Sequence, residues 1–230
     1  MFSRLLATPL RKASVAVAAT TGAGLTYVAS QSTLIHPLPT DDPIFSTPSY
    51  RKLNPHSNPV NDDRVTREIP LNTIRPELLE SDEKLTLALC QATWSQAGFS
   101  PLRGFWTLRH SGPATAHQLW TADQCSKATY EPGTEITNAF TVLTNSPEEI
   151  TVRFGDIPAN SGLRPLDGLF AIEAKMDKER GVAKFTYTTL AWKGDEKVEG
   201  GGKAVPLPAD AVHWLAARLW MTLASGKLQK

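Results

Sequence analysis

The sequence contains little cysteine and almost no net charge. Its 230 residues include two cysteines, Cys90 and Cys125, and the formal net charge is +1. Two cysteines do not provide the disulfide framework of a small secreted domain. Cys90 lies among apolar residues and is expected in the core, whereas Cys125 lies in a polar stretch, either as a reactive thiol or as a bystander. The balanced charge, with no basic patch interleaved with aromatic residues, argues against a nucleic-acid partner.

The sequence also lacks the short motifs that mark common cofactor and metal sites. The glycine run at 200–202 is not followed by the Lys-Ser/Thr pair of a phosphate-binding loop, and no dinucleotide-binding fingerprint is present. His110, His117, Asp123 and Cys125 fall within one irregular stretch, but their spacing matches no closed zinc pattern. We therefore predict neither a metal site nor a cofactor.

No acidic residue precedes Asp41, and the only charges in residues 1–31 are basic. A basic segment rich in Ser and Thr is typical of a mitochondrial presequence, and we predict mitochondrial targeting. The apolar run 13–29 consists mostly of small side chains and is shorter than the about 20 strongly apolar residues of a bilayer span. Three alternatives remain: membrane association through 13–29 as a single anchor, a cleaved secretory signal, and a tail without a targeting function.

Prolines and polar residues are concentrated in residues 32–63, which contain six prolines. Such a composition is typical of linkers and irregular surface segments. We therefore predict three parts: a targeting or anchor segment at 1–31, a Pro-rich linker without regular structure at 32–63, and a single α+β domain at 64–230.

The clearest structural pattern is a hairpin over Gly168–Trp192. Apolar residues alternate from Phe170 to Met176, which places them on one side of an extended chain. A charged turn ending in Gly181 follows, and then a second strand, Val182–Trp192, rich in β-branched and aromatic residues.

Helical periodicity marks two further segments, Asp82–Gln96 and a last helix from Pro208 to about Gly226. The apolar stripe of the last helix is expected to face the core and consists of Val212, Leu215, Ala216, Leu219 and Leu223. Shorter segments are expected as strands, namely Val65–Ile74, Leu102–Arg109, Ala139–Leu143 and Ile150–Phe154.

This order of elements predicts an α+β fold in which a curved antiparallel sheet packs on a long C-terminal helix. The chain resembles the START-like, or helix-grip, superfamily, and is most similar to a small uncharacterised START-like family of plants and bacteria. Three stretches carry the resemblance: the helix Leu85–Trp94 with its Gly98-Phe99 turn, the hairpin Gly168–Thr189, and the Pro-x-Pro entry to the helix that carries His213, Ala217 and Arg218. The resemblance implies a cavity between the sheet and the last helix, and it implies no catalytic residue.

The first functional hypothesis is therefore a protein that binds a small lipophilic molecule in that cavity. The candidate lining residues are Trp106, Trp120, Phe154, Phe170, Tyr187, Trp214 and Arg218. Each of them is equally compatible with an ordinary structural role. We expect Arg218 either to bind an acidic ligand or to pair with a carboxylate such as Asp156 or Asp167.

The second hypothesis is a cofactor-free enzyme of the cyclase, dehydratase or isomerase type. Such chemistry needs a titratable group beside an apolar substrate, and the candidates are His117, Asp123 and His213. A third hypothesis is an assembly or scaffold protein of a membrane complex, which would require that the run 13–29 is retained as an anchor.

The targeting hypothesis predicts that a fluorescent reporter fused behind residues 1–40 accumulates in mitochondria. The expected basis is the basic, acid-free composition of the segment. Co-localisation with a mitochondrial dye measures the outcome, and secretion of the reporter or retention in the cytosol would contradict it.

Overall fold

The computed structural model of the chain describes residue 24 and residues 26–230. Most of the predicted targeting segment lies outside these residues, so targeting stays a prediction. In the described part of the chain, no helix has both the length and the apolar character needed to cross a membrane.

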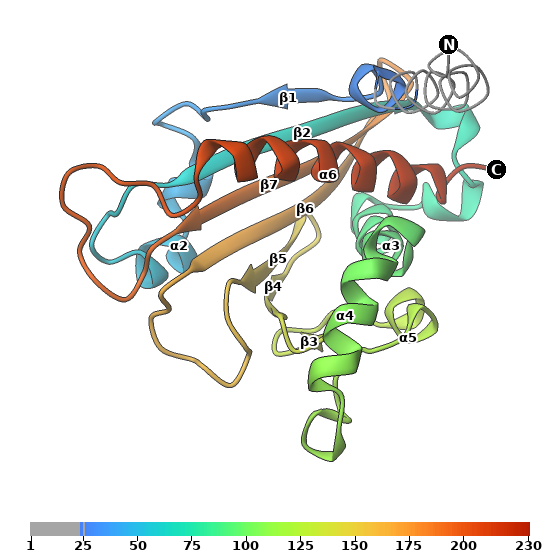
Figure 1. Cartoon of the computed structure of the whole chain (residues 1–230). Coiled ribbons are helices and arrows are strands. Elements are labelled where there is room, and N and C mark those ends of the chain that lie inside the picture. Colours follow the sequence, from blue (N-terminus) through green and yellow to red (C-terminus); the bar gives the residue numbers. More distant parts are fainter. Residues whose placement is uncertain (1–23, 25) are drawn as a thin grey trace, which may run out of the picture.

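The described residues form one seven-stranded sheet in the order β1-β2-β7-β6-β5-β4-β3, with every pair of neighbouring strands antiparallel (Figure 1). The strands are β1 Thr33–Ile35, β2 Asn61–Pro70, β3 Glu135–Ile136, β4 Phe140–Asn145, β5 Glu149–Phe154, β6 Asp167–Asp177 and β7 Val182–Trp192. The predicted α+β class, with an antiparallel sheet and a C-terminal helix, is confirmed.

The predicted hairpin is formed by β6 and β7, whose register runs from the pair Asp167 and Trp192 to the pair Asp177 and Val182. Gly181 has a φ of 67°, in the left-handed region that glycine adopts without strain, so the glycine closes the turn. The shorter predicted hairpin is formed by β4 and β5.

The helices are unequally distributed over the sheet. They are η1 Pro43–Ser46, α2 Pro48–Leu53, η2 Leu71–Thr73, η3 Pro76–Leu78, α3 Asp82–Ser95, η4 Ala97–Phe99, α4 Ser100–His110, η5 Pro113–Thr115, α5 Ala122–Lys127 and α6 Leu207–Gly226. Figure 1 shows α6 lying along β2 and β7, with α3, α4 and α5 gathered at one end of the sheet. The main core lies between the sheet and α3 and α6, and it includes Leu85, Trp94, Phe185 and Met221.

The structure corrects the predicted face of α6. Its buried apolar residues are Ala217, Met221 and Ala224, and the two alanines let the helix approach the strands closely while Met221 fills the core. Most of the predicted stripe is on the outside, where Leu219 is 37% exposed. The side chains exposed with it are Val212 and Leu215. The helix carries apolar residues on most of its sides, so periodicity alone could not select the buried one.

The predicted strand Leu102–Arg109 is also wrong, because these residues belong to α4. Pro101 occupies the first turn of that helix, a position where the missing N–H of proline costs no hydrogen bond. The first predicted strand, Val65–Ile74, lies four positions too late, since β2 spans Asn61–Pro70.

Residues 32–63 do contain regular structure, contrary to the prediction. Pro43 begins η1 and Pro48 begins α2, and the side chains of Asp42 and Thr47 cap these two helices. Two of the six prolines that suggested an irregular linker therefore mark helix starts.

This segment covers the face of the sheet opposite α6. Trp192 donates its indole N–H to the carbonyl of Leu53 at 3.1 Å. An apolar cluster separate from the main core lies on this face. It consists of Leu38, Ile44, Leu53, Leu169, Ala171, Leu190 and Trp192. The sheet is thus covered on both faces, and only the α6 face carries the cavity described below.

The corrected face of α6 predicts that Met221→Ala lowers the free energy of unfolding by about 2–5 kcal/mol, because Met221 is fully buried. The matched control Leu219→Ala, two residues away on the exposed side, should cost less than about 1 kcal/mol. Urea denaturation of both variants measures the difference. Equal losses would show that the helix is rotated from the orientation described.

Candidate functional site

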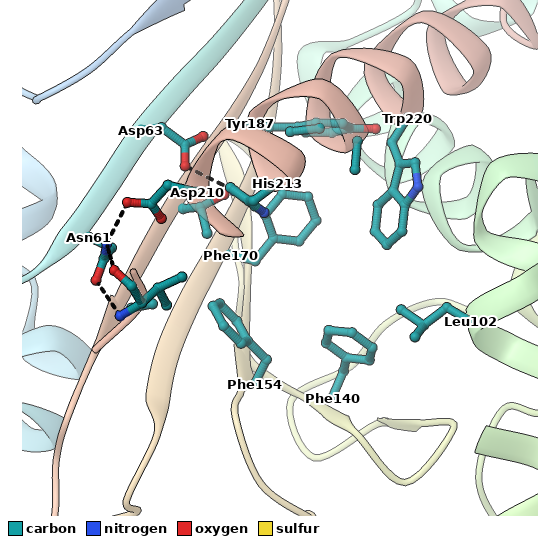
Figure 2. A pocket seen from close by; sticks show the side chains of 15 residues that line it. Asn61, Asp63, Leu102, Phe140, Phe154, Phe170, Tyr187, Asp210, His213 and Trp220 are labelled. Carbon is teal, nitrogen blue, oxygen red and sulfur yellow. Dashed lines mark hydrogen bonds and ion pairs between the residues drawn. The ribbon is translucent and has the colours of Figure 1, made fainter. Parts of the chain in front are cut away.

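A cavity of about 350 Å³ lies between the sheet and α6. Figure 2 shows its lining as a group of aromatic rings that faces a group of polar side chains. The lining residues are Asn61, Asp63, Leu102, Phe140, Phe154, Phe170, Tyr187, Thr189, Ala191, Val205, Asp210, His213, Ala216, Ala217 and Trp220.

Aromatic rings form most of the apolar wall. Alternate residues of β5, β6 and β7 point toward α6, which brings Phe154, Phe170 and Tyr187 to the same face. The rings of Phe170 and Tyr187 pack edge to face, with 5.0 Å between their centroids. The Tyr187 hydroxyl forms a short hydrogen bond with Thr93, so it is engaged within the protein. Burial raises the pKa of Tyr187, and the phenol stays neutral.

The polar end of the cavity consists of Asn61, Asp63, Asp210 and His213. Asn61 and Asp63 are alternate residues of β2 and point to the α6 side together with Val65. Asp210 and His213 are three residues apart on α6, and therefore lie on one side of its first turns. Strand pairing and helix packing thus bring together two short segments from opposite ends of the chain.

Asn61 attaches the beginning of α6 to β2. Its side-chain amide donates to Oδ2 of Asp210 at 2.6 Å and to the carbonyl of Val205 at 2.9 Å. Its side-chain oxygen accepts from the N–H of Val205 at 2.9 Å. These bonds satisfy both ends of a buried amide and fix the position of Asp210, which is 6% exposed.

Asp63 and His213 form an ion pair across the cavity end, with Nε2 of His213 lying 2.9 Å from Oδ2 of Asp63 (Figure 2). The ring N–H is not aligned with that oxygen, so the contact is mainly electrostatic. Burial lowers the pKa of His213, but the contact with Asp63 and the charge of Asp210 raise it by more. The net effect is a pKa above the ordinary value of 6.5, which favours a charged imidazolium.

Two buried oxygens of the lining have no hydrogen-bond partner among the residues that the structure describes. They are Oδ1 of Asp63 and Oγ1 of Thr189. The two residues are directly paired across β2 and β7, and they are 4% and 6% exposed. Buried polar atoms without partners are rare in folded proteins and call for an explanation.

The structure brings four of the sequence-predicted site residues into the cavity lining, namely Phe154, Phe170, Tyr187 and His213. Among the others, Trp106 lies on α4 beside His110, and Trp214 packs against His36. Trp120 donates its indole N–H to the carbonyl of Thr115 at 2.8 Å. None of these three tryptophans lines the cavity.

Arg218 does not point to the cavity either, and it donates to the carbonyl of Ala29 at 2.9 Å. The two carboxylates proposed as its partners are engaged elsewhere. Asp167 forms a buried ion pair with Arg153 at 2.6 Å, and Asp156 accepts from the Ile157 N–H at 2.7 Å. Arg218 therefore pairs with neither carboxylate expected for it and does not line this cavity.

The remaining catalytic candidates do not line the cavity. His117 is exposed and lies 3.1 Å from Oε2 of Glu135, while Asp123 is exposed and pairs with Lys127 at 2.6 Å. Over residues 24 and 26–230, no cluster of three or more His, Cys, Asp or Glu side chains could hold a metal ion. Burial raises the pKa of Cys125 to about 11, which keeps it a thiol.

Sequence reasoning missed Asn61, Asp63 and Asp210. One signal was available, because Asn61 and Asp63 continue the inward alternation of Val65 and Ile69 toward the start of β2. Polar residues at inward positions of a strand suggest a buried polar site. The predicted strand began too late to include them.

Comparisons of the chain with protein-family models, with curated proteins and with solved structures find no match. The cavity and its polar end must therefore be interpreted from their own geometry and chemistry.

The raised pKa of His213 predicts a pH-dependent contribution to stability. A folded-state pKa above the unfolded value means that the contribution is complete below about pH 6.5 and is lost as the pH rises through the folded pKa. The advantage in melting temperature of the wild type over His213→Gln should therefore shrink from about pH 6 to pH 8.5. If the difference in melting temperature stays constant or grows from about pH 6 to pH 8.5, the pKa of His213 is not raised in the folded protein.

Proposed function

We propose that the protein binds a small lipophilic molecule in the cavity between its sheet and α6. The observation that carries the proposal is a cavity of about 350 Å³ lined mainly by aromatic and small apolar side chains, with a few polar groups at one end. Small-molecule sites have this composition, and their volumes begin at about 300 Å³. Protein interiors are otherwise close-packed, with few voids larger than a water molecule.

The proposal includes a fold of the helix-grip type. The order of elements supports it, because β2 precedes α3 and α4, an antiparallel meander from β3 to β7 follows, and the long α6 packs back on the sheet. The relation to START-like proteins rests on this order and on the sequence resemblance.

An acid–base enzyme is the second candidate function, and the ion pair of Asp63 and His213 favours it. A histidine held by a carboxylate beside an apolar cavity can transfer a proton to or from a bound molecule. A cyclase, dehydratase or isomerase that needs no cofactor would use such a pair. The two functions differ in one observable: an enzyme releases its bound molecule chemically changed.

Binding can be tested with prodan, an uncharged naphthalene dye whose emission shifts in apolar surroundings. The variant Ala216→Phe places a ring where the half-buried Ala216 lines the cavity. We expect it to weaken prodan binding by about tenfold or more, since the added ring occupies the space of the dye. Fluorescence titration measures the affinity.

The matched control is Ala211→Phe, which adds the same ring at an exposed position of α6 outside the cavity lining. It should bind prodan as the wild type does, and both variants should unfold cooperatively. If the wild type does not bind prodan, or if the two variants bind it equally, the cavity is not a binding site for lipophilic molecules.

A further inference from the structure

We propose that the ligand of this cavity is a lipophilic amine, whose ammonium group binds at the polar end against Asp63 and Asp210. The inference rests on the proposed binding function and specifies the chemical class of the ligand. Its basis is the charge of the lining, the position of the unpartnered oxygens and the location of the aromatic rings.

The charge of the polar end is negative. Among the described residues that line the cavity, the charged groups are Asp63, Asp210 and His213, and none is Lys or Arg. Two carboxylates and one imidazolium give a net charge of −1, and neutral imidazole leaves −2. Carboxylates removed from water are costly unless an opposite charge or hydrogen-bond donors compensate them. A ligand with an ammonium group supplies both an opposite charge and hydrogen-bond donors.

The unpartnered oxygens define where the head group would lie. Asp63 and Thr189 face each other across β2 and β7 on the cavity side, so their side chains begin only about 5 Å apart. A carboxylate oxygen accepts hydrogen bonds and cannot donate them. The missing partner of Oδ1 of Asp63 is therefore a donor, and an ammonium group offers three.

The neighbouring groups disfavour a ligand with an anionic head group. An anionic head group would meet both carboxylates, and Arg218, the cation expected to bind an acidic ligand, donates to the carbonyl of Ala29 and lies outside the lining. The Tyr187 hydroxyl is bonded to Thr93. The apolar body of the ligand would extend from the polar end toward Phe154, Phe140 and Trp220, as the arrangement in Figure 2 indicates.

The test uses three probes with one alkyl chain and different head groups: octylamine, octan-1-ol and octanoate. Isothermal titration at pH 7, with prodan displacement as a second readout, measures their affinities for the full chain. We expect octylamine to bind about tenfold more tightly than octan-1-ol, because its ammonium adds a charge attraction to the hydrogen bond that a hydroxyl can also donate to the carboxylate, and octanoate to bind most weakly.

Three variants test whether the preference for octylamine arises at the polar end of the cavity. Asp63→Asn should remove most of the preference for octylamine over octan-1-ol, because the attraction between an ammonium and a carboxylate is lost. His213→Gln removes the same ion pair but keeps the carboxylate, so it should retain the preference. Glu68→Gln is the matched control, since it removes one carboxylate from the same strand at an exposed position paired with Arg180.

The outcomes separate the two proposals. If octan-1-ol or octanoate binds as tightly as octylamine, the ligand class is wrong and the binding function stands. If Asp63→Asn and Glu68→Gln have the same effect, the amine is not held by Asp63 and the inference fails. If none of the probes binds and prodan does not bind, both proposals fail.

Discussion

The helix α6 is attached to the sheet by two different kinds of contact, and the cavity depends on the difference. Toward its C-terminal end, Met221 and Ala224 are fully buried, and Arg67 of β2 donates to the carbonyl of Thr222 at 3.0 Å. Toward its N-terminal end, the contacts with β2 are polar and run through Asp210 and His213. Polar side chains span a gap that apolar packing would close, so space remains between the helix and the sheet.

The polar end of the cavity holds a buried carboxylate oxygen that has no hydrogen-bond partner among the described residues. An unpaired oxygen on a buried carboxylate costs free energy that an apolar residue at position 63 would not. The Asn61 amide, by contrast, is bonded at both its oxygen and its nitrogen. A protein that needed only to attach α6 to β2 would have no use for the free oxygen. Under the proposed function, this oxygen accepts a hydrogen bond from the ligand.

The second face of the sheet gives the site a rigid support. Leu190 and Trp192 of β7 are fully buried beneath the segment that contains η1 and α2, while Thr189 and Ala191 of the same strand line the cavity. The same strands therefore contribute to a packed apolar layer on one side and to the cavity lining on the other. Because alternate residues of a strand point to opposite faces, packing on one face holds the cavity side chains of the other in place.

The sequence alone determined the elements whose signals are local. The hairpin of β6 and β7 follows from alternation and a glycine turn, and α3 follows from its helical periodicity. The tertiary structure alone decided which side of α6 is buried, since several of its sides are apolar. It also decided that Asp63 meets His213, because residues far apart in the chain are brought together only by strand pairing and helix packing.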